Sequence, residues 1–448
     1  MITLNNINLS SIDLSGIDLR GIKLGLGGRG GGSGDGFPQL PGDVTRWHFG
    51  GLTNEMMAAM DDPRIEDADH KGRFLSFKNF AWKEGSGISD VYPGALVFDG
   101  VDDYGVCENF PILTKEKGYT VVALRQWITY NPNAISAIAT NASDQSFNGA
   151  FTFENYNKGA EQTISYGATQ ISLQYSKSPF SWQTTSKYNG VNIANGNKDA
   201  TNSLVLGRSY PQRNDFANFA IWELVFLDHD ATEEELTKIK DYFVKTYPWL
   251  FPDQAWTVVG KTNEDEDRAT IANITGNGND LVCLNLGFIE GSGYNEEGEY
   301  AGYLVTDGVD DKIVSSVFGM GKDFTIVGDW KLINTGKNDN AGIVKFDSIV
   351  IYNYNPILIN IKNGRNNLIP DQNTVNAICS DGRIYSKDWK ESIYNEETES
   401  TSKNLLTIGY SGNIYTKIAF KNLAIYPTVL SKEDCIKAYN YLQTLNAK

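Results

Sequence analysis

The sequence predicts a mainly β protein made of two tandem β-sandwiches, each ending in a short α-helix. Aromatic residues form 12% of the chain, and its 23 tyrosines far outnumber its 5 methionines, a bias that favours strands over helical bundles. Residues 170–175 alternate polar and apolar side chains, as a strand with one buried face does. Asn-Gly at 189–190 and Asp-Gly at 381–382 are typical of tight hairpins. The third observation is that the pattern occurs twice.

The two halves of the chain carry the same short motifs in the same order. Gly-x-Thr-Asn-Glu, Glu-Gly-Ser-Gly and Asp-Gly-Val-Asp-Asp each appear once per half. The aligned pairs are 51–55 with 260–264, 84–87 with 290–293, 96–103 with 304–311, and 218–222 with 422–426. Collinear agreement of this kind predicts a tandem duplication. We place the two modules at 45–251 and 252–448.

Each module is predicted to end in one helix. Thr232 and Glu235 form a capping box, in which the hydroxyl accepts an amide hydrogen and the glutamate reaches back to the cap. Apolar residues then follow at helical spacing. Ser431 and Asp434 repeat the device in the second module, with the shorter aspartate in place of glutamate.

Residues 1–24 repeat isoleucine and leucine every five positions. The residues concerned are Ile7, Leu9, Ile12, Leu14, Ile17, Leu19, Ile22 and Leu24. A period of five fits neither a helix nor an alternating strand, but it resembles the pentapeptide-repeat pattern. So few repeats cannot bury their own apolar face. We therefore expect an anchoring segment that packs on other copies or on another protein. Chance periodicity in a disordered tail is the alternative.

The next segment and the overall charge restrict the function further. Residues 25–44 open with a run of glycines and are expected to form a flexible linker. The net charge of −16 argues against binding nucleic acid or an anionic membrane. No apolar stretch approaches the roughly 20 residues that span a bilayer. We also expect no secretory signal, because Met1 to Asn8 lacks the basic and apolar regions of one.

The residue types that carry catalysis or bind metals are sparse. The four cysteines form no C-x-x-C pair, so buried reduced thiols are expected. The three histidines all lie in the first half, and neither a G-x-S-x-G nor an H-E-x-x-H motif occurs. The acidic string 264–267 lacks the apolar residues that would place its acids on a strand. The chain is thus expected to be no enzyme and to need no cofactor.

Residues 96–103, together with the strand 119–127, resemble the paired strands of laminin-G-like, concanavalin A-like jelly rolls. Residues 324–330 fit the same pattern in the second module. The resemblance implies sandwiches that bind glycans through an aromatic platform with neighbouring amides. The candidates are Trp182, Tyr188 and Asn189 in the first module, and Tyr385 and Trp389 in the second. The alternative is that these aromatic residues belong to the core.

The paired aspartates at 102–103 and 310–311 have two interpretations. Several carboxylate oxygens close together suit calcium. Aspartates after a strand also accept backbone N–H groups in turns, which is the commoner role. The sequence leaves both open.

The repeated motifs and the layout resemble head-fibre or capsid-decoration proteins of crAss-like phages of Bacteroidales. The resemblance implies a place on the virion surface, with the N-terminus bound to capsid or other virion proteins. It also implies a homo-oligomer, a dimer or trimer, that binds neutral glycans weakly and multivalently. The alternative is a bacterial glycan-binding protein, at the cell surface or secreted, that is not part of a virion.

Overall fold

The predicted anchor and the glycine run fall outside the residues that the structure describes. The ranges that the computed structural model describes are 36–114, 116–129, 137–142, 151–153, 170–175, 200–208, 214–333, 342–345, 349–352, 357–361, 365–369, 375–393, 404–411 and 414–445. Within them, no helix is long and apolar enough to cross a membrane.

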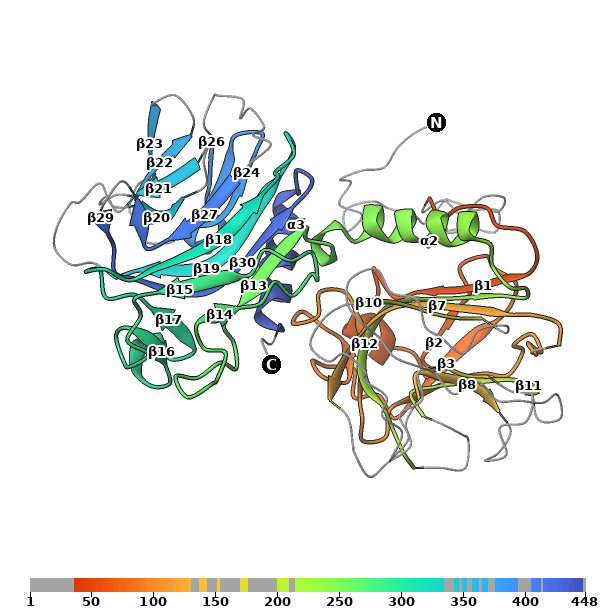
Figure 1. The fold of residues 1–448 in the computed structure, drawn as a ribbon. Helices are drawn as coiled ribbons and strands as arrows, with labels where there is room; N and C mark the ends of the chain where they lie inside the picture. The colour runs from red at the N-terminus through yellow and green to blue at the C-terminus, as the bar shows by residue number, and fades with distance from the viewer. Residues whose placement is uncertain are drawn as a thin grey trace, which may run out of the picture.

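Module 1 is a sandwich of two antiparallel six-stranded sheets (Figure 1). The first sheet has the order β10 (Gln170–Tyr175), β7 (Thr120–Thr129), β12 (Asn218–Leu227), β5 (Leu96–Asp99) and β4 (Gly87–Ile88), with β1 (Val44–His48) also paired to β12. The second has the order β2 (Arg64–Glu66), β3 (Phe74–Lys78), β6 (Tyr104–Cys107), β11 (Ala200–Leu206), β8 (Ala139–Ala142) and β9 (Thr152–Phe153). The short helix α1 (Asn54–Ala58) precedes β2.

Module 2 repeats this plan with two eight-stranded sheets. Its first sheet has the order β16 (Gly293–Asn295), β17 (Tyr303–Val305), β30 (Ile418–Tyr426), β19 (Thr325–Leu332), β24 (Val375–Cys379), β25 (Arg383–Ser386) and β26 (Glu391–Ile393), with β13 (Gln254–Thr257) also paired to β30. Its second has the order β14 (Thr270–Ile271), β15 (Leu281–Leu284), β18 (Lys312–Phe318), β27 (Asn404–Ile408), β20 (Gly342–Lys345), β21 (Ile349–Tyr352), β22 (Ile357–Ile361) and β23 (Arg365–Ile369). A separate hairpin pairs β28 (Tyr410–Ser411) with β29 (Ile414–Tyr415), and the 3-10 turns η4 (Gly298–Tyr300) and η5 (Lys387–Trp389) complete the module. The predicted mainly β fold of two tandem jelly-roll sandwiches is confirmed.

The strand registers correct one alignment that was made from the sequence. Trp47 lies opposite Leu224, and Trp256 lies opposite Leu423. Glu223 therefore corresponds to Asn422, so the aligned pair 218–222 and 422–426 is out of register. Buried strands repeat a few apolar residue types, and this similarity of composition produced the false match.

Both predicted closing helices are present, α2 (Glu233–Thr246) and α3 (Lys432–Gln443). The capping box of α2 is complete, because Glu235 N–H donates to Thr232 Oγ1 and Thr232 N–H donates to the Glu235 carboxylate. In α3 the Asp434 N–H donates to Ser431 Oγ, and the aspartate accepts from the serine hydroxyl. Caps of this kind stabilise a helix by about 1 kcal/mol.

A single apolar cluster joins the helix-side faces of both modules. The 3-10 turn η3 (Pro248–Leu250) lies at the junction, and α3 lies on the side of module 2 that faces module 1 (Figure 1). Trp249 is only 6% exposed, with the ammonium of Lys437 4.4 Å from its ring centroid. The Tyr426 hydroxyl donates to the Trp249 carbonyl at 2.9 Å. The boundary predicted between 251 and 252 thus lies within a continuous core.

The folded part of module 1 begins earlier than the boundary predicted at 45. Phe37 is 7% exposed and packs edge-on against Tyr242, with ring centroids 5.0 Å apart. The Arg46 guanidinium lies 4.3 Å from the Phe37 centroid. Phe37 therefore belongs to module 1 rather than to the linker, because these contacts bury its ring.

Module 1 contains a buried polar network beneath α2. Glu223 is fully buried and accepts hydrogen bonds from the hydroxyls of Tyr242 and Tyr247, at 3.1 and 2.9 Å. Its other oxygen lies 3.5 Å from Arg46 Nη1, and His48 Nδ1 lies 2.6 Å from the first. A buried carboxylate needs such partners to offset its desolvation. The strand registers place Ala255, Thr257 and Asn422 at the positions of Arg46, His48 and Glu223, so module 2 replaces the ions with neutral side chains.

We predict that Trp249→Ala uncouples the two modules. Removing this buried ring should lower the free energy of unfolding by roughly 3–5 kcal/mol, with the loss concentrated at the junction. Denaturant unfolding, followed by tryptophan fluorescence and circular dichroism, should change from one transition to two. Val309→Ala, at a side chain that is 71% exposed, is the control and should leave the curve unchanged. Two transitions in the unaltered protein would contradict the prediction.

Candidate functional site

The aromatic candidates taken from the sequence do not form an exposed platform where the structure describes them. Tyr385 is fully buried and belongs to the core cluster at the junction. Its hydroxyl accepts a hydrogen bond from Arg383 at 3.2 Å. Trp389 is half-buried and packs edge-on against Tyr439 of α3. The glycan role predicted for Tyr385 is therefore corrected to a core role, because a ring without exposed surface cannot stack on a sugar. The residues proposed in module 1, Trp182, Tyr188 and Asn189, lie outside the described residues.

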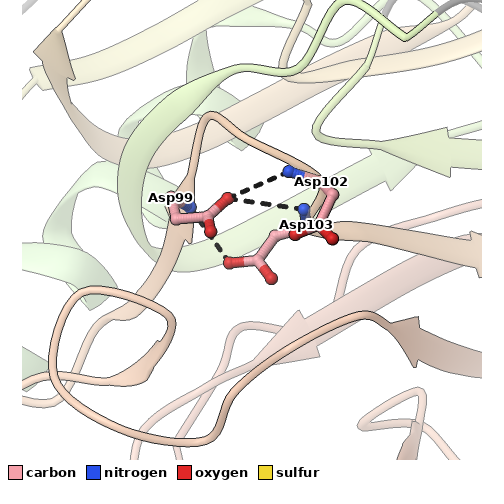
Figure 2. Close-up of side chains that lie close together, drawn as sticks. All are labelled: Asp99, Asp102 and Asp103. Carbon is pink, nitrogen blue, oxygen red and sulfur yellow. Dashed lines mark hydrogen bonds between the residues drawn. The ribbon is translucent and has the colours of Figure 1, made fainter.

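The aspartates after β5 form a hydrogen-bonded turn (Figure 2). The Asp99 carboxylate accepts the backbone N–H groups of Val101, Asp102 and Asp103, at 2.8, 3.2 and 3.4 Å. The Asp103 carboxylate accepts the Asp99 N–H and the Ser86 hydroxyl, both at 3.0 Å. These bonds are those of an aspartate turn.

The second copy builds the same turn. Asp307 accepts the N–H groups of Val309 and Asp310, and Asp311 accepts the Asp307 N–H at 2.8 Å and the Ser292 hydroxyl at 2.7 Å. In each module three carboxylates come within 4.8 Å of one another. The hydrogen bonds that these carboxylates accept are those of the turn interpretation.

Two other repeated motifs, Gly-x-Thr-Asn-Glu and Glu-Gly-Ser-Gly, contact each other in both modules. The Asn54 side chain pairs with the backbone of Ile88, accepting its N–H and donating to its carbonyl, both at 2.7 Å. Asn263 makes the same pair with Tyr294, at 2.8 and 2.7 Å. Gly87 lies between these partners with φ of 145°. A Cβ on it would come within 2.3 Å of Asn54 Oδ1, so only glycine fits.

The buried aspartate of each turn has a raised pKa. Burial raises the pKa of Asp103 from 3.8 to about 7, against the opposing effect of the hydrogen bonds from the Asp99 backbone and Ser86. Burial also raises the pKa of Asp311. Desolvation disfavours the charged form of a carboxyl group. Asp103 therefore contributes most to the stability of the folded state at low pH, and this contribution is lost as the pH rises toward its folded pKa of about 7.

The outer face of the second sheet of module 1 carries an open groove of about 520 Å³. Strands β2, β3 and β6, together with residues just before β2 and just after β6, supply its side chains. They are aromatic, hydroxyl, amide and charged: Asp62, Arg64, Phe74, Ser76, Lys78, Tyr104, Val106, Glu108 and Asn109. Because side chains alternate along a strand, the residues between them face the sandwich core. We call this set the module 1 groove.

Two aromatic rings stand at opposite ends of the groove. Phe74 is 40% exposed, and the Arg64 guanidinium lies 4.9 Å from its centroid. Tyr104 is half-buried between Phe216, with centroids 6.3 Å apart, and Arg208, whose guanidinium lies 4.0 Å from the Tyr104 ring. Each arginine restricts the orientation of its ring through a cation–π contact. The groove thus combines fixed aromatic surface with hydrogen-bonding groups.

Module 2 has a different surface at the equivalent place. Its strand registers match Ser76 with Val282, Lys78 with Leu284 and Tyr104 with Lys312. Val282 is 40% exposed and Leu284 is 36% exposed. The two modules therefore share a fold but present chemically different outer faces.

Sequence reasoning missed the module 1 groove although a signal was present. Phe74 and Tyr104 occupy outward positions of strands in the first copy, and the second copy has Asp280 and Lys312 there. An aromatic residue that faces outward in one copy and is polar in the other is not required by the core. Comparing the copies position by position would have singled out both rings.

Comparisons with known proteins add little to this geometry. No family model and no curated protein matches the chain. Among solved structures, Trypanosoma rangeli sialidase is 8% identical, with 84% of this chain and 67% of that chain covered, at a TM-score of 0.31. A mutant of that sialidase with trans-sialidase activity is 11% identical over 41% of this chain and 31% of that one, at 0.28. The botulinum neurotoxin serotype D binding domain is 9% identical over 79% and 92%, at 0.29. Likenesses this weak carry no argument about function.

We predict that Asp103 makes module 1 less stable as the pH rises. With a pKa of about 7 when folded and 3.8 when unfolded, the folded state binds more protons between these values. The free energy of unfolding should thus fall by on the order of 2 kcal/mol from pH 4 to pH 7. Asp103→Asn should flatten this dependence, whereas Asp102→Asn, at an exposed neighbour, should retain it. Urea titrations across this pH range measure the slopes, and equal slopes in both variants would contradict the prediction.

Proposed function

We propose that this chain is a virion surface protein, a head fibre or capsid decoration, whose module 1 groove binds neutral saccharides. The observation that carries the binding role is the pair of aromatic rings, Phe74 and Tyr104, placed outward on neighbouring strands with the Ser76 hydroxyl between them and Asn109 also lining the groove. Sugars bind on such surfaces because their C–H faces pack on rings while their hydroxyls find polar partners. The virion role rests on the motif resemblance and on the predicted anchor at 1–24.

The charges in the groove support a neutral ligand. Lys78 Nζ lies 2.8 Å from Asp62, and Arg64 lies 3.8 Å from the same carboxylate. The cations therefore already face an anion within the groove. With a net charge of −16 over the whole chain, an acidic saccharide would also meet long-range repulsion.

The same carboxylate supports binding rather than hydrolysis. A glycosidase needs a carboxylic acid with a raised pKa as its proton donor. The hydrogen bond from Lys78 lowers the pKa of Asp62 below 3.8, which is the opposite of that requirement. We therefore propose a binding protein that leaves its ligand intact.

A module 1 groove that binds on its own implies that tight adhesion depends on several chains. A single open site of this size should bind weakly, with a dissociation constant on the order of 0.1–1 mM. Several chains on one particle convert later contacts into intramolecular ones and raise the avidity. Oligomerisation through 1–24 would supply that arrangement.

We predict that Phe74→Ala and Tyr104→Ala each weaken saccharide binding about tenfold, since a stacked ring contributes roughly 1–2 kcal/mol. A glycan array should first select a neutral ligand for the intact oligomer, and titration calorimetry should then compare the variants. Lys312→Ala changes the equivalent position of module 2 and is the matched control, expected to bind normally. Binding that survives both aromatic variants would place the ligand elsewhere. An array with no neutral ligand would contradict the saccharide role.

We predict that deleting 1–36 abolishes association with the particle while leaving the modules folded. The cut keeps Phe37, whose packing on Arg46 and Tyr242 belongs to module 1. Full-length protein should co-sediment with purified virions, and the truncated chain should remain in the supernatant with an unchanged circular dichroism spectrum. Full-length Phe74→Ala should still sediment, which separates anchoring from glycan binding. Failure of the full-length protein to sediment would favour the alternative of a bacterial glycan-binding protein.

A further inference from the structure

Two buried cysteines of module 2 lie side by side although they are far apart in the sequence. Cys379 is the last residue of β24, and Cys435 lies in the first turn of α3. Both side chains are 0% exposed and belong to the apolar cluster at the junction. Their thiols lie close enough for each to change the pKa of the other.

The backbone on both sides of this contact is held in place. Thr325 Oγ1 lies 3.8 Å from Cys379 Sγ and accepts the N–H of Leu430 at 2.9 Å. The Leu430 carbonyl lies 4.0 Å from the same sulfur, one residue before the cap Ser431 of α3. The strand and the helix start are thereby fixed against each other.

The surroundings also make the two thiols unequal. The hydrogen bond from Cys435, with help from Thr325 and the charge of Arg383, lowers the pKa of Cys379. The same contact, together with burial, raises the pKa of Cys435. Cys379 is therefore the sulfur that ionises first, and a thiolate is the attacking species in disulfide exchange.

We propose that Cys379 and Cys435 form an intramolecular disulfide when the protein meets an oxidising environment, fastening α3 to β24. The oxidant is a small-molecule disulfide such as oxidised glutathione. The Cys379 thiolate attacks one sulfur of the oxidant and releases one glutathione thiolate. Cys435 loses its proton and attacks the mixed disulfide, which releases the second. The two cysteines lose two electrons and two protons, and one disulfide is reduced to two thiols.

This proposal departs from the expectation of buried reduced thiols for one pair only. All four cysteines are buried, and none of them forms a disulfide in the structure. The oxidant can reach the pair when α3, a helix of 12 residues, opens transiently. The bond would close a loop of 435 − 379 = 56 positions, and such loops restrict the unfolded chain substantially. Because α3 also packs at the junction, the bond would stabilise the contact between modules.

The test uses the full-length protein equilibrated with oxidised glutathione. After denaturation and alkylation, mass spectrometry should find two of the four thiols protected, and peptide mapping should link Cys379 to Cys435. The melting temperature should rise by on the order of 5–10 °C and return after dithiothreitol treatment.

Variants assign the effect to this pair. Cys379→Ser and Cys435→Ser should each keep three free thiols and show no shift with oxidant. Cys107→Ser in module 1 should still lose two of its three thiols. Four free thiols in the unaltered protein at equilibrium, a persistent glutathione adduct, or a different linkage would each overturn the proposal. The mapping of the unaltered protein decides the matter even where a variant fails to fold.

Discussion

The rest of the molecule depends on one constraint. Each module must bury the apolar outer face of its first sheet, which contains β12 in module 1 and β30 in module 2. A helix is about 10 Å wide, whereas the five strands from β10 to β4, side by side at roughly 4.8 Å spacing, span about 20 Å. One closing helix therefore cannot cover the apolar face alone. The two modules solve this together, since α2, η3 and α3 form one continuous cluster with both sheets. The junction is thus one hydrophobic core that both modules share.

Features whose causes are local in the sequence could be predicted. The backbone hydrogen bonds of the aspartate turn are contained in five residues, 99–103, and those of the capping box in four, 232–235, so they follow from nearby residues. The repeat made these motifs easier to recognise, because each occurs once in each module. The jelly-roll sandwich then followed from the order of strands and turns. In the described residues, these motifs serve the fold, and none of them forms the groove.

Features set by distant parts of the chain could not be predicted. The residues around Tyr385 suggest an exposed sugar platform. In the structure α3, some fifty positions later in the chain, covers Tyr385. The register of β30 depends on its partners β13 and β19 rather than on its own apolar string. Comparing the two copies shows that the core does not require an aromatic residue at Phe74, but only the pairing of β3 with β6 places Phe74 on the same outer face as Tyr104. Strand pairing and the helix that covers a sheet decide whether an aromatic side chain is buried or exposed. Neither can be predicted from the neighbouring residues alone.

The pairing of Asn54 with Gly87 limits the order in which the chain can accept substitutions. A side chain at 87 would meet both an unfavourable backbone conformation and the amide oxygen at 54. Replacing Asn54 first would leave the backbone groups of Ile88 without their partners. Either single substitution therefore destabilises the fold, so neither position can change before the other. Asn263 and Gly293 are linked in the same way in module 2. The two modules differ in the side chains of their outer faces, but both retain these linked asparagine and glycine positions.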